Sequence, residues 1–124
     1  MTVVVVDVAN VMGARPDGWW RDRAGAALRL GREVAALARA DPSNEWVLVL
    51  EGRARDAAPL LEQQTTARVV SAPASGDDTI VEVAVASVAR GESCLVVTAD
   101  RELQRRCAEH GASVVSPGWL LERL

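Results

Sequence analysis

The 124-residue sequence predicts a single α/β domain, residues 1–124, in which helices cover both faces of a five-stranded parallel sheet. Short apolar runs alternate along the chain with segments of helical periodicity, and this alternation is typical of strand–helix–strand units. The apolar runs have no polar face, as expected for strands that are buried on both sides. Hydrophobic residues make up 49% of the chain but aromatic residues only 3%, so the core must consist mainly of valine, leucine, isoleucine and alanine.

The first half of the chain predicts two strands and two helices. The β-branched run Val3–Val8 is expected to be the first strand. A loop containing RPDGWW follows, since Pro-Asp-Gly is a strong turn signal. Apolar residues at helical spacing predict a helix from about Asp22 to Ala40. Beyond the DPSN break, Glu45–Glu51 is expected to be the second strand, and a short helix is expected from Asp56 to about Gln64.

The second half of the chain repeats this pattern. A nearly all-apolar helix begins around Asp77, and another is expected between Asp100, its N-cap, and Gly111, its terminator. Pro117 stands near the start of a short closing helix. The remaining three strands are ARVVSA (67–72), SCLVVTA (93–99) and ASVVS (112–116). A helix therefore separates each strand from the next, which is the arrangement that a parallel sheet requires.

Four carboxylates are expected at one edge of this sheet. Asp7 lies near the carboxyl end of the first strand, Asp100 follows the fourth strand, and Asp77 and Asp78 open the helix that leads into the fourth strand. Ligands of doubly wound sheets bind at the carboxyl ends of the strands, where the strand order reverses. Carboxylates brought together there would repel and raise one another's pKa values. Mg²⁺ or Mn²⁺, which prefer oxygen ligands, would relieve that repulsion.

Each of these acids also has an ordinary structural interpretation. Aspartate is a favoured N-cap residue, so Asp100 and the Asp77–Asp78 pair can simply cap helices. The DVAN segment can form a turn in which an aspartate accepts a backbone hydrogen bond. Two aspartates followed by Glu82, however, carry more negative charge than capping needs. We expect Glu82 itself to be a solvent-exposed residue at the end of the helix rather than a ligand.

Three motifs, in this order, resemble the NYN branch of the PIN-like nucleases, with the bacterial YacP-type proteins as the nearest match. They are DVAN after the first strand, SGDDTIVE at the start of a helix, and VVTADRELQRR after the fourth strand. Val8 and Ala9 stand where the family typically has a glycine and an aromatic residue. LVLEG resembles the family's second strand ending, with Glu51 in place of the usual aspartate. The resemblance covers essentially the whole chain and implies the strand order 3-2-1-4-5.

The same resemblance implies metal-dependent hydrolysis of RNA phosphodiester bonds. Asp7, Asp77 and Asp100 would be the metal ligands, Asp78 an additional ligand or a supporting acid, and Asn10 a residue that orients a ligand or the substrate phosphate. One or two Mg²⁺ or Mn²⁺ ions would lower the pKa of a bound water and bind the scissile phosphate. Attack by water would leave a 5′-phosphate. Such chemistry needs no histidine or lysine base, and the chain has one histidine and no lysine.

The segment ARPDGWWRDR is the expected RNA-binding loop. Adjacent tryptophans cannot both face one core, so one of them is free to stack on a base while nearby arginines bind phosphates. The alternative is a loop fixed by one tryptophan, with Asp22 capping the next helix. A formal net charge of −3 argues against a general nucleic-acid-coating surface, so the basic patch would be local. The expected binding residues are Arg15, Trp19, Trp20, Arg21, Arg23 and Arg101.

Cysteine and hydrophobicity patterns narrow the class of protein further. Cys94 and Cys107 are not in a CxxC pair and are expected to be small buried hydrophobic residues, so we expect neither a zinc site nor a structural disulfide. No apolar run approaches a membrane-spanning length and no leader-like segment is present, so we expect a cytoplasmic protein that contacts no membrane. Trp46 and Trp119 are expected to pack in the core or at an interface, and a homodimer stays open as an alternative to a monomer.

Two other functions remain open at this point. An acid-pocket phosphatase or nucleotide hydrolase would use a similar sheet, although the phosphatase and phosphoacceptor types we considered need a lysine that this chain lacks. A non-catalytic RNA-binding domain would keep the fold without turnover. Release of nucleotides from RNA would indicate a ribonuclease, and release of phosphate from small phosphoesters would indicate a phosphatase. RNA binding without turnover would indicate a non-catalytic domain.

Overall fold

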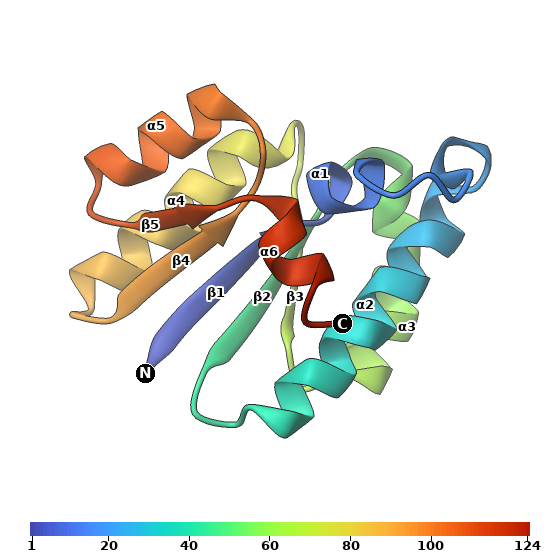
Figure 1. Ribbon diagram of the computed structural model, residues 1–124, viewed down its shortest axis with the longest axis horizontal. Helices are drawn as coiled ribbons and strands as arrows, with labels where there is room; N and C mark the ends of the chain where they lie inside the picture. The colour runs from blue at the N-terminus through green and yellow to red at the C-terminus, as the bar shows by residue number, and fades with distance from the viewer.

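The computed structural model describes residues 1–124 and contains one five-stranded parallel sheet in the order β3-β2-β1-β4-β5 (Figure 1). The predicted α/β class and strand order are therefore confirmed. The strands are β1 (Thr2–Asp7), β2 (Glu45–Leu50), β3 (Arg68–Ser71), β4 (Ser93–Val97) and β5 (Ser113–Val115). The helices are α1 (Val8–Gly13), α2 (Arg23–Ala40), α3 (Ala58–Gln64), α4 (Gly76–Ala89), α5 (Arg101–Glu109) and α6 (Pro117–Leu121), with 3₁₀ turns η1 (Trp19–Arg21) and η2 (Gly52–Ala57).

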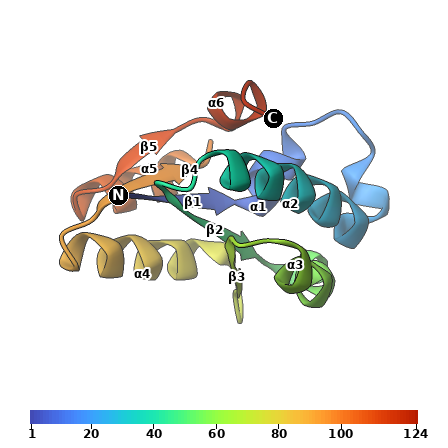
Figure 2. The ribbon, with the colours of Figure 1, turned by 90° about the horizontal axis from the view of Figure 1, so that it is seen from below.

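Helices cover both faces of the sheet, so that the molecule has three layers. Helices α4 and α5 pack on one face, and α1, α2, α3 and α6 pack on the other; Figure 2 shows α4 and α2 on opposite sides of the sheet. Along β1, Val4 and Val6 belong to the core under α2, whereas Val3 and Val5 belong to the core under α4. This alternation explains why the strand sequence has no polar face.

Helix α1 departs from the sequence prediction, which placed a loop directly after the first strand. The aspartate that ends β1 is also the N-cap of α1, because the side chain of Asp7 accepts a hydrogen bond from the backbone N–H of Asn10. Val8, Val11 and Met12 on this helix are buried. Burial of these side chains stabilises a helix of only six residues, and the loop begins after it.

Other element boundaries agree more closely with the sequence. Asp22 caps α2 as expected, with Oδ1 accepting from the N–H of Gly25 at 2.9 Å. The chain between β2 and α3 forms the 3₁₀ turn η2, so α3 begins at Ala58 rather than near Asp56. None of the helices combines the length and the apolar character that crossing a membrane requires.

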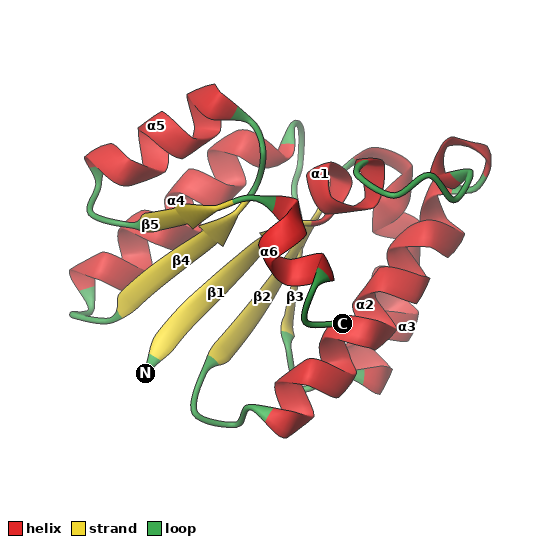
Figure 3. Ribbon diagram, viewed as in Figure 1, coloured by secondary structure: helices red, strands yellow, loops and turns green.

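The sheet brings three helix starts to one place. All strands point the same way, so β1, β2 and β4 end at a common edge, as the arrowheads in Figure 3 show. Helix α1 begins at the end of β1, and α5 begins shortly after β4. Helix α4 returns along the sheet to enter β4, so that it also starts at this edge. We call this side of the molecule the carboxyl edge.

Candidate active site

Asp7 is the buried acid of the carboxyl edge. Its side chain is fixed at the end of β1 with only 6% of the residue exposed. Oδ1 accepts from the backbone N–H of Asn10 at 3.3 Å, and Oδ2 accepts from the hydroxyl of Thr98 at 2.9 Å. Both carboxylate oxygens therefore have a donor from the protein, one from α1 and one from the end of β4.

Burial raises the pKa of Asp7 from its ordinary value of 3.8 to about 6. The hydrogen bonds from Thr98 and from the backbone of Asn10 lower the pKa, but the carboxylates of Glu51 and Asp77 raise it further. Taking a carboxylate out of water beside other acids disfavours its charged form. Asp7 thus carries its negative charge at a cost that a nearby cation would offset.

Thr98 ties the first strand to the fourth. Its side chain is fully buried, and its hydroxyl both donates to Asp7 and accepts from the backbone N–H of Asp100 at 3.2 Å. Asn10 adds a second tie, since its Oδ1 accepts from the N–H of Ala99 at 2.8 Å. Asp100 caps α5 as expected, with Oδ1 accepting from the N–H of Leu103 at 3.1 Å. Asn10 and Thr98 therefore hold the two aspartates in fixed relative positions.

Asp77 and Glu51 complete the group of acids. Asp77 is half-buried in the first turn of α4, and its pKa is raised by burial, then by the carboxylates of Asp100 and Glu51. Glu51 follows β2 directly, and its Oε2 accepts from the backbone N–H of Gly76 at 2.7 Å. Gly52 has φ of +56°, a left-handed conformation that a side chain would strain, so the chain can turn away immediately after Glu51. We call Asp7, Glu51, Asp77 and Asp100 the acidic cluster.

The interpretation of Asp77 and Asp78 as caps of α4 is wrong. The helix starts at Gly76, so both aspartates are already inside it, and the N-cap residue Ser75 makes no capping hydrogen bond through its side chain. Glu51 supplies the acceptor from the neighbouring strand. The aspartates contribute only their charge to the positive end of the helix.

Glu51 and Thr98 are the residues that sequence reasoning did not place in the site. The LVLEG ending pointed to Glu51, and no sequence signal distinguished Thr98.

Asp78 and Glu82 lie outside the acidic cluster. The side chain of Asp78 is 77% exposed, and its Oδ1 accepts from Nη2 of Arg106 on α5 at 2.8 Å. Glu82 is exposed one turn further along α4, as expected. The proposed role of Asp78 as a ligand stays a prediction, with an arginine as its present partner.

The two adjacent tryptophans have different surroundings. Trp19 is half-buried and packs against the core under α2, whereas Trp20 is 55% exposed. Their rings meet edge to face with centroids 5.9 Å apart. The guanidinium of Arg23 lies over the ring of Trp19 at 5.2 Å, and that of Arg21 lies over Trp20 at 5.7 Å. The expectation that one tryptophan faces the core and the other does not is therefore confirmed by the structure.

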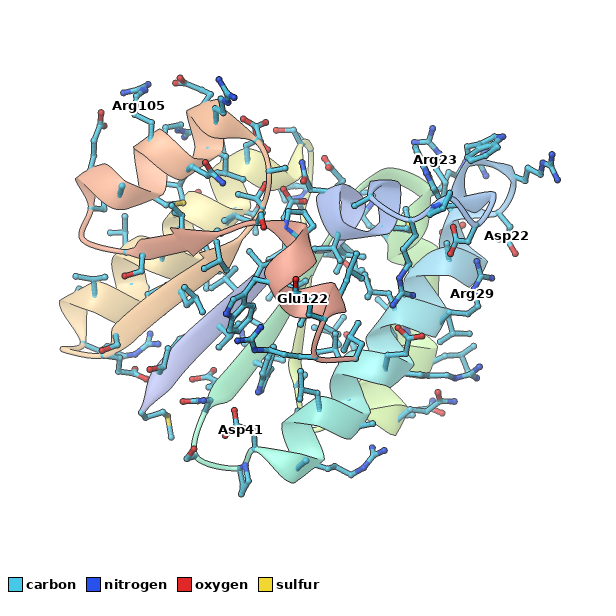
Figure 4. All side chains as sticks on the ribbon, in the orientation of Figure 1. Asp22, Arg23, Arg29, Asp41, Arg105 and Glu122 are labelled. Atoms are coloured by element: carbon cyan, nitrogen blue, oxygen red, sulfur yellow. The ribbon has the colours of Figure 1, made fainter.

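The arginines of the predicted basic patch differ in whether an acidic side chain pairs with them. Arg15 forms an ion pair with Glu33 on α2, while Arg101 is exposed at the first position of α5, next to Asp100. Arg105, further along α5 and not among the predicted binding residues, pairs with Glu102 and Glu109, and Figure 4 shows it on the opposite side of the view from Arg23. Arg21, Arg23 and Arg101 are the predicted arginines without an ion pair to an acidic side chain.

A pocket of about 460 Å³ lies between the tryptophan loop and the acidic cluster. Trp19 and Arg23 line it together, and Glu51 lines it from the side of the cluster. Ala9 and Met12 of α1, and Ser75 before α4, contribute further to its wall. We call it the tryptophan pocket. It shares the side chain of Glu51 with the acidic cluster, so the two features are contiguous.

Comparison with known proteins decides the fold. No family model matches the sequence, and no curated protein matches it. Among solved structures, the chain is similar to the crystal structure of Rae1 (YacP) from Bacillus subtilis, with a TM-score of 0.67. The two are 18% identical in sequence, and the match covers 98% of this chain and 74% of that chain. The chain shares the fold of this YacP structure. The YacP-type fold accounts for the strand order, and the carboxyl edge of that fold is where the acidic cluster lies.

Proposed function

We propose that this protein is a ribonuclease that hydrolyses RNA phosphodiester bonds with Mg²⁺ or Mn²⁺ at the acidic cluster. One observation carries the proposal: four acids from four different segments lie at the carboxyl edge, near enough to interact electrostatically, and the pKa of the buried one, Asp7, is raised to about 6. The YacP-type fold and the resemblance of the three motifs to PIN-like nucleases support the same activity.

The chemistry of the donor set fits a hard divalent cation. All the available ligand atoms are carboxylate oxygens, which suit Mg²⁺ and Mn²⁺ rather than softer metals. Burial, and then the neighbouring carboxylates, raise the pKa values of Asp7 and Asp77, so a bound cation would offset the cost of their negative charge. No three acidic, histidine or cysteine side chains are gathered closely enough to hold a metal ion in the present arrangement. We propose that Asp7, Asp77 and Asp100 would hold the ion, and that Asp78 would join only by giving up Arg106.

When bound, the metal would supply a hydroxide nucleophile at neutral pH and neutralise charge on the phosphate. The residues of the chain would position these ligands. Thr98 and Asn10 hold Asp7 and the Asp100 segment, and Glu51 holds the start of α4, which carries Asp77. Arg101, exposed beside Asp100, is placed to meet a phosphate of the substrate.

The test is cleavage of a 5′-labelled single-stranded RNA by the purified protein in Mn²⁺, in Mg²⁺ and in EDTA. We expect cleavage with metal only, and products whose new ends carry a 5′-phosphate. Asp7→Asn is expected to lose the activity, whereas Asp56→Asn, a matched change at an exposed aspartate of η2, is expected to keep it. Release of phosphate from small phosphoesters with intact RNA would instead indicate a phosphatase. RNA binding without turnover in either metal would indicate a binding domain.

A further inference from the structure

We propose that the tryptophan pocket receives one unpaired nucleobase of the RNA, and that Trp19 is the ring on which this base stacks. The inference rests on the proposed ribonuclease function, because it places the base next to the phosphate that the acidic cluster would act on. It assigns single-stranded or looped-out RNA as the substrate class, since a paired base must first leave its helix to enter a pocket of this kind.

The position of the pocket carries the first part of the argument. Glu51 lines the pocket and also belongs to the acidic cluster. Ala9 and Met12 line it from α1, the helix that Asp7 caps. When the phosphate of a nucleotide lies at the acidic cluster, the base of that nucleotide, or the base of the next nucleotide along the RNA, is therefore within reach of the pocket. No other hollow of the molecule has an acid of the cluster in its wall.

The chemistry of the pocket carries the second part. Five of its nine lining residues are hydrophobic, and its volume of about 460 Å³ lies in the range of small-molecule sites. The guanidinium of Arg23 lies over the ring of Trp19 at 5.2 Å, so a base that stacks on this face takes the place of the guanidinium, which stays beside it as a second planar group. Glu51, Ser75 and Arg23 supply polar groups for the edge of a base.

Trp19, and not its neighbour, is suited to this role because it is held in place. It packs against the core, meets Arg23 on its ring, and approaches Gly13, where an added Cβ would lie 3.8 Å from the ring. A ring that is already ordered loses little conformational entropy when a base stacks on it. Trp20 is mostly exposed and does not line the pocket.

The molecule contains a natural control for this pair. The guanidinium of Arg123, just after α6, lies over the ring of Trp119 on that helix at 4.1 Å, in the wall of a hollow of about 480 Å³ near the starts of β1 and β2. This second pair has the same chemistry but no acid of the cluster beside it. The proposal therefore predicts that a base binds at Trp19 and that none binds at Trp119.

The experiment compares two fluorescein-labelled oligomers, a hexamer of adenylates and an abasic ribose-phosphate hexamer of the same charge. Binding is measured by fluorescence polarisation with Ca²⁺ in place of Mg²⁺, and a gel checks that the oligomers stay intact. We expect the wild-type protein to bind the base-bearing oligomer at least fivefold more tightly. Trp19→Leu should reduce this preference to less than twofold, and the matched change Trp119→Leu should leave it unchanged.

A second variant keeps the test decisive if Trp19→Leu does not fold. Ala74→Leu adds volume at an exposed loop residue that lines the pocket, and it should remove the preference while Trp19 is present. A folded Trp19→Leu protein that keeps the preference, or a wild-type protein that has none, would overturn the inference. Cleavage of RNA without any preference for the base-bearing oligomer would overturn this inference and leave the proposed function standing. A base preference that depends on Trp19 in a protein that cleaves no RNA would overturn the proposed function alone.

Discussion

The two ends of the sheet carry similar features and differ in their charges. Each end has a hollow with a tryptophan–arginine pair in its wall, Trp19–Arg23 at the carboxyl edge and Trp119–Arg123 near the starts of β1 and β2. The largest hollow of the molecule, about 740 Å³, also lies at this second end, which we call the amino edge. The acidic cluster, however, lies only at the carboxyl edge.

Carboxylates at the two ends have different partners. At the amino edge, Asp41 accepts from the hydroxyl of Ser43 at 2.9 Å and from the side-chain amide of Asn44 at 2.7 Å. At the carboxyl edge, burial raises the pKa values of Asp7 and Asp77, and neighbouring carboxylates raise them further. Buried acids beside other acids, rather than the size of a hollow, therefore distinguish the end of the fold that holds the candidate site.

The sharpest test of this comparison is the removal of one charge at each end. Asp7→Asn is expected to reduce RNA cleavage by at least about 100-fold, because a charged ligand to the metal is lost. Asp41→Asn is expected to leave the cleavage rate unchanged, since Asp41 serves only the turn before β2. The measurement is single-turnover cleavage in Mn²⁺. Equal rates for wild type and Asp7→Asn would contradict the role of the acidic cluster.

A second test uses pH. Asp7 has a higher pKa in the folded protein than its ordinary 3.8, so the folded state binds this proton more tightly than the unfolded state. Without metal, the contribution of Asp7 to the free energy of unfolding should therefore fall as the pH rises from about 3 to about 7, by about 3 kcal/mol in total. Urea unfolding in EDTA measures this.

The pH test has the same pair of variants as its control. As the pH rises over that interval, Asp7→Asn should become steadily more stable relative to wild type, and the difference in unfolding free energy should then level off. Asp41→Asn should lose about 1 kcal/mol, because it gives up a hydrogen-bond acceptor. A wild-type protein that gains stability relative to Asp7→Asn from pH 4 to pH 6 would show the sign to be wrong.

Metal binding provides a third test. Mn²⁺ at a hundredfold excess over its Kd should stabilise the folded protein by about 2.7 kcal/mol. Asp77→Ala should remove most of this gain, and Asp78→Ala should remove less, because Asp78 lies outside the cluster and pairs with Arg106. Thermal melting with EDTA and with Mn²⁺ compares the three proteins. Loss of the shift in Asp78→Ala and its retention in Asp77→Ala would mean that the two roles are reversed.

The smallest expected effect concerns the start of α4. Glu51→Gln keeps an oxygen that can accept from the N–H of Gly76, whereas Glu51→Ala leaves that N–H without its partner. We expect Glu51→Ala to be less stable than Glu51→Gln by about 1 kcal/mol, the usual cost of losing a helix cap. Urea unfolding in EDTA measures the difference. Equal stabilities would indicate that water replaces the cap.

The sequence predicted the sheet and most of the acids because both leave local signals. Buried parallel strands appear as apolar runs; Asp7 ends one of them and Asp100 follows another closely, while Asp77 stands in the first turn of the nearly all-apolar helix α4. Helix α1 was missed because six residues are too few for a helical period to be recognised, and an aspartate after a strand suits a turn as well as a cap. The partners of Glu51 and Thr98 lie 25 and 91 residues away along the chain, so the LVLEG motif could indicate an acid at Glu51 but not its bond to Gly76, and nothing local indicated the role of Thr98.

Thr98 has a consequence for how the site takes up a proton. A hydroxyl has a single hydrogen, and that of Thr98 points to Oδ2 of Asp7 while its oxygen receives the N–H of Asp100. Oδ1 of Asp7 is occupied in turn by the N–H of Asn10. An oxygen that has gained a proton is a weaker acceptor, so protonation of Asp7 weakens either its bond to the first turn of α1 or its link through Thr98 to α5. The same proton removes a buried charge and so stabilises the folded state as a whole, which means that acidification would trade the precision of the site for the stability of the fold.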